Sequence, residues 1–199
     1  MENIAPVNHP VNSLIAKRWS PRSFQMDHSI DRAKLATIFE AVRWAPSASN
    51  LQPWRFIVGV DYDDTHTRIF GSLKEGNQRW AKAAPVLVVA LVALNLADGS
   101  GPNRHAFHDV GLALENLFLQ AADLGLNCHL MAGFDADIIM QSFRVPDGYE
   151  PITACALGYP GKLEDLAEDL QVRELMPRRR KALEDFVFGG RWGASLDLA

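Results

Sequence analysis

Ten consecutive residues, Pro85-Val86-Leu87-Val88-Val89-Ala90-Leu91-Val92-Ala93-Leu94, are apolar without any alternation. A strand with one face in water alternates apolar and polar residues, so a continuous run predicts a strand that is buried on both faces. We therefore expect a central sheet with helices packed against both of its sides. The apolar run is also too short to span a bilayer, which needs roughly twenty such residues.

The remaining periodicity predicts helices and strands on either side of this strand. Apolar spacings of three and four predict helices over 32–45, 61–73, 103–124 and 135–143, and strand patterns cover 54–60, 128–132 and 151–157. The longest helix carries an apolar stripe from Phe107 to Leu124 and further apolar residues on another side, Leu112 and Leu119. A helix that is apolar on two sides is either central to a core or shared between subunits.

Composition limits the classes of function. The chain has 199 residues, 48% hydrophobic residues and a formal net charge of −4, which predicts one domain and gives no support for a nucleic-acid or membrane partner. Its two cysteines, Cys128 and Cys155, lie in strand-like surroundings and predict buried free thiols in a reducing compartment. No signal-peptide pattern opens the chain, so we expect a cytoplasmic protein.

Histidines near the start of the longest helix raise the question of a metal site. His105, His108 and Asp109 have a spacing that metal ligands can adopt, but no further cluster of ligands supports them. Histidines in a polar first turn are usually just solvated. We therefore expect no metal.

A polar loop between two prolines, Pro46 and Pro53, joins the first long helix to the next strand. Each proline restricts its own φ and the residue before it, so the loop is expected to be stiff. It presents hydroxyl and amide groups, which suit the edge of a planar heterocycle carrying C=O and N–H groups. The alternative is an ordinary helix-to-strand connection, in which such residues are common.

Basic residues are grouped near both ends of the chain. Arg18, Ser20 and Arg22 alternate, so an extended segment would point all three the same way. A second group, Arg178-Arg179-Arg180-Lys181, lies far along the chain. Tight arginine groups in an acidic protein favour one small anion, such as a phosphate, which matches the guanidinium fork. The alternative is that the arginines only solvate surface turns.

Four stretches in this order resemble the FMN-dependent nitroreductase family. They are Arg18-Trp19-Ser20-Pro21-Arg22, the loop from Ala45-Pro46-Ser47 to Pro53-Trp54, the long helix with Gly125-Leu126 and Gly133-Phe134-Asp135 beyond it, and Ala156-Leu157-Gly158-Tyr159-Pro160 followed by Arg178, Arg180, Lys181 and Glu184. Each stretch alone is weak. Together they cover nearly the whole chain in register.

The resemblance implies an α+β fold with a central, mostly antiparallel sheet flanked by helices, assembled as an intertwined homodimer. Residues 1–199 would form a single domain, with 160–199 as a C-terminal extension reaching over the partner. The resemblance also implies FMN as cofactor, with the loop residues contributed by the other subunit. The implied cofactor-binding residues are Arg18, Trp19, Ser20, Arg22, Pro46, Ser47, Ala48, Asn50, Gly133, Arg178 and Arg180.

The implied activity is transfer of hydride from NADH or NADPH through flavin N5 to nitroaromatic, quinone or similar acceptors. No catalytic side chain is expected, because the flavin carries the chemistry, and Arg22 would lie near flavin N1 and O2. Asn77 or Arg79 are weaker candidates for a contact to the cofactor. Alternatives are narrower chemistry on the same fold, such as dehydrogenation, dehalogenation or flavin breakdown, and a non-catalytic FMN store or sensor.

The chain departs from the family pattern at two positions. Ala132 stands where many members carry an acidic residue before the glycine aligned to Gly133, so the choice of donor or substrate is expected to differ. Trp19 stands where a basic residue is frequent, which leaves the expected phosphate site one fewer positive neighbour.

Overall fold

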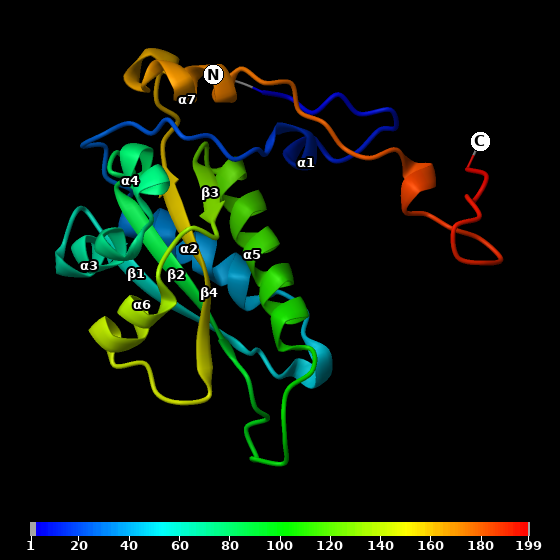
Figure 1. The fold of residues 1–199 in the computed structure, drawn as a ribbon, viewed down its shortest axis with the longest axis horizontal. Helices are drawn as coiled ribbons and strands as arrows, with labels where there is room; N and C mark the ends of the chain where they lie inside the picture. The colour runs from blue at the N-terminus through cyan, green and yellow to red at the C-terminus, as the bar shows by residue number, and fades with distance from the viewer. Residues whose placement is uncertain (1–2, 199) are drawn as a thin grey trace.

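The continuous apolar run forms strand β2 (Val86–Ala93), at the centre of a four-stranded sheet. The structure is a computed structural model that describes residues 3–198. The strand order is β1-β2-β4-β3, and every neighbouring pair is antiparallel (Figure 1). The other strands are β1 (Trp54–Val60), β3 (Asn127–Met131) and β4 (Tyr149–Gly158). The expected antiparallel sheet is confirmed.

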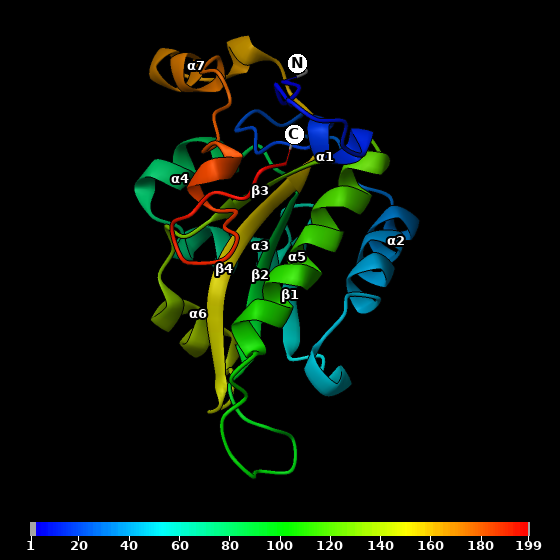
Figure 2. The ribbon, with the colours of Figure 1, turned by 90° about the vertical axis from the view of Figure 1, so that its right-hand side faces the viewer.

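Helices cover both faces of the sheet, as the pattern of β2 predicts (Figures 1 and 2). On one face, α2 (Arg32–Arg43) and α5 (Ala106–Asp123) form a core with Val86, Val88, Ala90 and Val92. On the other face, α3 (Asp64–Ser72), α4 (Glu75–Ala81) and α6 (Ala136–Phe143) form a second core with Leu87, Val89 and Leu91. Successive strand residues point to opposite faces, so one strand contributes to both cores.

The long helix α5 is largely buried, but one predicted core residue is not. Val110, Ala113, Leu114, Leu117 and Ala121 are buried against the sheet. Phe107 was expected on the same stripe, but it is 52% exposed, because it lies in the first turn, where the helix leaves the loop after β2. Figure 1 shows α5 at the edge of the body, with one side open.

The N-terminal segment and the chain that follows β4 run near one another above one end of the sheet, and the C-terminus lies far to the side (Figure 1). Helix α1 (Ser13–Lys17) has Asn12 as its N-cap, and α7 (Glu168–Glu174) follows the 3₁₀ turn η2 (Leu163–Asp165). Beyond α7, residues 176–198 leave the body as an extended segment with one further 3₁₀ turn, η3 (Leu183–Asp185); we call this segment the C-terminal arm.

Some helix predictions were incomplete. Helix α4 covers 75–81, where no helix was predicted, and Trp80 and Ala81 bury their side chains in the second core. Helix α3 begins only at Asp64, since Asp61 and Tyr62 form a left-handed turn with φ of 49° and 61°. Helix α7 was not predicted at all. Within residues 3–198, no helix is long and apolar enough to cross a membrane.

Candidate functional site

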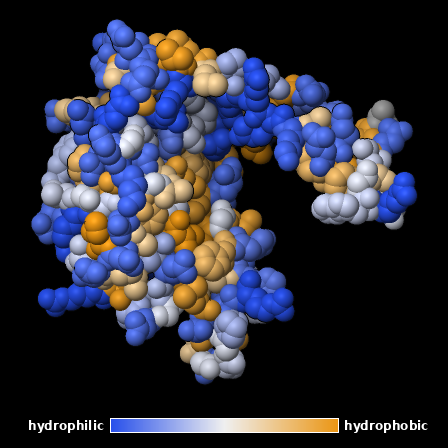
Figure 3. Space-filling view, in the orientation of Figure 1, coloured by the Kyte–Doolittle hydropathy of each residue, from blue (hydrophilic) through white to orange (hydrophobic). Residues whose placement is uncertain are grey.

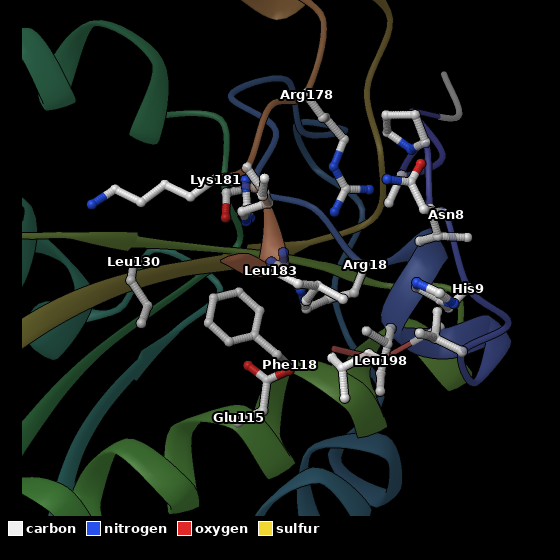
Figure 4. A pocket seen from close by; sticks show the side chains of 18 residues that line it. Asn8, His9, Arg18, Glu115, Phe118, Leu130, Arg178, Lys181, Leu183 and Leu198 are labelled. Atoms are coloured by element: carbon white, nitrogen blue, oxygen red, sulfur yellow. The ribbon is translucent and has the colours of Figure 1, made fainter. Parts of the chain in front are cut away.

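A cavity of about 910 Å³ lies between the body and the two ends of the chain (Figure 4). Arg18 and Ser20 line it from the N-terminal side, and Arg178, Arg180 and Lys181 line it from the C-terminal side. In Figure 4, Arg178 points toward Arg18, whereas Lys181 extends in another direction. The two arginine groups that are far apart in the sequence therefore meet at one cavity.

The cavity is electropositive because its three arginines lack counter-ions. Within the described part of the chain, none of the guanidinium groups of Arg18, Arg178 and Arg180 lies within 4.0 Å of a carboxylate oxygen. Burial lowers the pKa of Arg178 from its ordinary value, and the neighbouring charges of Arg18 and Arg180 lower it further. Glu115 also lines the cavity, but it forms no ion pair with these arginines, so an anion in the cavity would meet a net positive charge.

Each arginine is held by a different contact. The Arg18 guanidinium carbon lies 5.1 Å from the ring centroid of Phe118, a buried residue of α5. Nη1 of Arg178 donates to the carbonyl oxygens of Asn3 at 2.7 Å and Ala16 at 2.9 Å. Arg180 donates to its neighbour's carbonyl oxygen at 2.7 Å and is otherwise exposed. Arg178 therefore joins the two ends of the chain, while Arg18 and Arg180 remain open to the cavity.

The expected alternation of Arg18, Ser20 and Arg22 holds only for its first two members. Arg22 lines a different cavity, beside Arg79 and Trp80. Its backbone N–H donates to Oε1 of Glu174 at 2.7 Å, and its Nη1 lies 3.4 Å from Oε2 of the same carboxylate. Trp19 does not line the arginine cavity; it lines a smaller one, which Arg18 also lines. A buried carboxylate thus draws Arg22 away from the direction that alternation predicts.

His129 holds Pro21, the residue between Ser20, which lines the arginine cavity, and Arg22, which lines the other cavity. Its Nδ1 lies 2.9 Å from the carbonyl oxygen of Pro21, and its ring packs against Trp80 with centroids 4.5 Å apart. A carbonyl oxygen can only accept, so Nδ1 carries the proton. Burial lowers the pKa of His129 to about 4, and the charge of Arg22 acts in the same direction. His129 is therefore neutral at physiological pH.

The polar loop is strained as well as bounded by prolines. Ser49, Asn50 and Gln52 all have left-handed φ, at 49°, 57° and 48°. Such conformations cost free energy in residues other than glycine, and they concentrate at ligand-binding and active sites. Oδ2 of Asp109 accepts from the backbone N–H of Ala48 at 3.0 Å, and the hydroxyl of Ser47 accepts from the N–H of Gln52 at 3.1 Å.

Figure 2 shows this loop near the N-terminal end of α5, whereas α1 and the segment after it lie near the C-terminal end of the helix. Asp109, in the first turn of α5, holds the loop by a hydrogen bond. Phe118, nine residues later in the same helix, contacts Arg18. At 1.5 Å per residue, the two contacts are separated by roughly 14 Å along the helix. Pro46, Ser47, Ala48 and Asn50 therefore do not line the cavity that Arg18, Ser20, Arg178 and Arg180 share in one chain.

Gly133 lies beyond the end of β3, against α4. Its carbonyl oxygen accepts from the N–H of Lys74 at 2.9 Å and from Nδ2 of Asn77 at 3.0 Å. A Cβ at this position would lie 2.8 Å from Nδ2 of Asn77, so only glycine fits without displacing that amide. Ala132 is exposed beside it, and Arg79 is paired with Asp169 instead.

A sequence model of the nitroreductase family matches residues 15–69 and 60–159. The chain belongs to the nitroreductase family. An uncharacterized 15.4 kDa protein of Mycolicibacterium smegmatis is 40% identical over 67% of this chain and 88% of its own length. The major NAD(P)H-flavin oxidoreductase of Aliivibrio fischeri is 23% identical over 91% of this chain and 99% of its own length.

Solved structures agree with this membership. A crystal structure described as an oxidoreductase containing FMN has a TM-score of 0.90 and 35% identity, covering 96% of this chain and 97% of that one. A nitroreductase family protein of Clostridium difficile 630 has a TM-score of 0.68 and 26% identity, covering 89% of this chain and 96% of that one. The expected family and α+β fold are confirmed.

Two residues of this nitroreductase-family site could not be assigned from the sequence. Asp109 was considered only as a metal ligand, but its buried carboxylate holds the polar loop and contacts His108 Nδ1 at 3.0 Å. Glu174 gave no signal in a strongly charged stretch. Both cysteines are buried free thiols, as predicted. Within residues 3–198, no three His, Cys, Asp or Glu side chains are grouped to hold a metal ion.

Proposed function

We propose that this protein is an FMN-dependent oxidoreductase that passes hydride from NADH or NADPH to nitroaromatic, quinone or similar electron-poor acceptors. The observation that carries the proposal is the meeting of Arg18, Arg178 and Arg180 at one cavity without a carboxylate partner among the described residues. Membership of the nitroreductase family and the FMN and flavin descriptions of the relatives support the same cofactor.

The cavity fits the chemistry of FMN. Its volume, about 910 Å³, lies in the range of roughly 300–1,000 Å³ that is usual for small-molecule sites. The phosphate of FMN carries about two negative charges, and guanidinium groups are its matched partners. Phe118 and Leu130 add apolar walls to the same cavity. Polar cations at one part and apolar side chains at another suit a ligand with an anionic tail and a flat ring.

The chain's own residues would act by binding and orientation. Bound FMN would supply the redox chemistry, taking hydride from the nicotinamide donor at N5 and giving it to the acceptor. Arg18 and Arg180 would neutralise the phosphate, and Phe118 would hold the guanidinium of Arg18 in place. Gly133 would leave room for FMN to approach the backbone at the end of β3, because any larger residue would displace Asn77. We assign no side chain as general acid or base.

We further propose that a second copy of the chain completes the site. Pro46, Ser47, Ala48 and Asn50 would come from that second copy, because the loop lies about 14 Å along α5 from the Arg18 contact within one chain. The C-terminal arm supports an intertwined homodimer, since it projects from the body with Trp192 91% exposed and Phe186 56% exposed. Figure 3 shows a hollow beneath the arm, with apolar side chains on the body facing it.

The test begins with purified protein under anaerobic conditions. The protein, reconstituted with FMN and freed of excess cofactor, is mixed with NADPH and separately with NADH, while the flavin band near 450 nm is followed. Bleaching, and recovery when a quinone or nitroaromatic compound is added, would support the proposal. A yellow protein that never bleaches would indicate a store or sensor, and a protein that binds no flavin would refute the proposal. Light scattering during gel filtration measures the oligomeric state.

A further inference from the structure

The arginine cavity requires like charges to be held close together. Arg18 comes from the segment after α1, whereas Arg178 and Arg180 come from the start of the C-terminal arm. Like charges repel, and the interaction strengthens where the surroundings are less polar than water. Contacts elsewhere in the two segments must therefore hold them together before any anion binds.

Ser23 fastens the N-terminal segment to Lys162, before α7. Among the described residues, hydrogen bonds join that segment to α7 and the arm at two places. One is the pair of bonds from Arg178 to the carbonyl oxygens of Asn3 and Ala16. The other joins Arg22 to Glu174, the last residue of α7. Arg22 follows Arg18 by four residues, and Glu174 precedes Arg178 by four residues. The second contact therefore holds each segment at a point four residues from the arginine that lines the cavity, Arg18 or Arg178.

Glu174 is unusual for a charged residue in its burial. It is 2% exposed, and its two oxygens accept from the backbone N–H and the guanidinium of one residue, Arg22. Removing one member of a buried pair is strongly destabilising, because it leaves an uncompensated charge. Glu174 lines neither the arginine cavity nor the cavity beside Arg79, so it does not reach a ligand in either one.

We propose that Glu174 is a positioning residue: by holding Arg22 it fastens α7 to the N-terminal segment and so sets the spacing between Arg18 and the arginines of the arm. Anion affinity then depends on a carboxylate that never touches the anion. The inference rests on the proposed function only for the identity of that anion, the phosphate of FMN. His129, which is neutral, supports the same segment through its hydrogen bond to the carbonyl oxygen of Pro21.

The test compares E174Q with D169N in the full-length protein. Asp169 lies on the same helix and also pairs with an arginine, Arg79, at 2.6 Å, but that pair is exposed. D169N therefore removes one charge and one ion pair from α7 without touching the arginine-bearing segments. FMN and riboflavin are the two probes, because riboflavin shares the ring and lacks the phosphate. Affinities are measured by quenching of flavin fluorescence.

We expect E174Q to raise the Kd for FMN about tenfold or more. Such a rise corresponds to the loss of one hydrogen bond between the phosphate and a displaced arginine. Its affinity for riboflavin, and both affinities of D169N, should stay within about twofold of wild type. General destabilisation would instead weaken both probes together. E174Q combined with Arg22→Met should bind FMN no more weakly than Arg22→Met alone, because Glu174 acts through Arg22. Additive losses would overturn that route.

Amide hydrogen exchange provides a readout that does not depend on flavin. The peptide that covers residues 18–23 should exchange faster in E174Q than in wild type or D169N. If the wild type binds FMN, unchanged exchange or unchanged FMN affinity in E174Q would overturn the inference. The proposed function would then remain intact. A wild type that binds no FMN would overturn the proposed function, and the exchange comparison would still decide whether Glu174 positions the segment. If E174Q does not fold, Glu174→Asp enters the same comparison.

Discussion

Removing both open arginines of the cavity should separate flavin binding from folding. In the double variant Arg18→Ala with Arg180→Ala, FMN loses two guanidinium partners for its phosphate. A hydrogen bond to a charged group contributes about 1.5–3 kcal/mol, so two contribute about 3–6 kcal/mol. Arg180 is exposed and Arg178 remains, so the lower part of this range applies. We expect the Kd for FMN to rise about a hundredfold to a thousandfold.

The assay is a fluorescence titration of the apoprotein with FMN and with riboflavin. The wild type should prefer FMN, and the double variant should lose that preference, because riboflavin has no phosphate to hold. Arg179→Ala is the matched control, since Arg179 lies between Arg178 and Arg180 in the sequence but does not line the cavity. The wild-type preference should also fall as salt rises, since ions screen partly exposed charges.

Folding must be measured in the same variants. Arg18→Ala loses a contact to Phe118 that contributes about 0.5–1 kcal/mol at an exposed site, and loss of Arg180 relieves repulsion. The double variant should therefore melt within a few degrees of the wild type when both are free of flavin. If it keeps its FMN affinity within about threefold and still prefers FMN to riboflavin, the phosphate site has been misplaced.

Three further predictions concern other parts of the fold. Gly59→Ala should destabilise the protein by about 3 kcal/mol or more in urea unfolding, because its Cβ would overlap the backbone of His66, whereas Gly71→Ala, in open space on α3, should be neutral or stabilising. The pKa of His129 is lowered to about 4 from 6.5, so the folded state binds fewer protons than the unfolded state as the pH falls from 6.5 toward 4; stability should decline over that window, and His129→Gln should flatten the decline in pH-dependent unfolding. Asp109→Asn should accelerate amide exchange in the loop at 47–52 with little change in the sheet; equal protection in both proteins would show that the carboxylate does not hold the loop.

The sheet could be predicted because its pattern is local. The apolar run at 85–94 requires two covered faces, and β1 begins and ends where its aromatic and β-branched residues do. Asp31 and Asp135 cap α2 and α6, and such caps depend only on neighbouring amides. Local patterns therefore gave the core and most element boundaries.

The site could be predicted only in part, because its contacts join distant residues. Residue types and grouping indicated an anion site shared by Arg18 and Arg180, and these residues do line one cavity. The direction of Arg22 depends on Glu174, 152 positions away, and no spacing in the sequence shows that partner. The role of Asp109 depends in the same way on an amide 61 positions earlier. Such pairings become visible only after the chain has folded.

The contact between Arg178 and Ala16 joins positions 162 residues apart. During synthesis the sheet and its covering helices are made before Arg178, since the last strand, β4, ends at Gly158. A product cut short after α7 would retain both hydrophobic cores and the N-terminal half of the anion site, but not the arm. Such a fragment would lack Arg178 and Arg180 and should bind the proposed cofactor more weakly, so cofactor affinity would distinguish finished molecules from truncated ones.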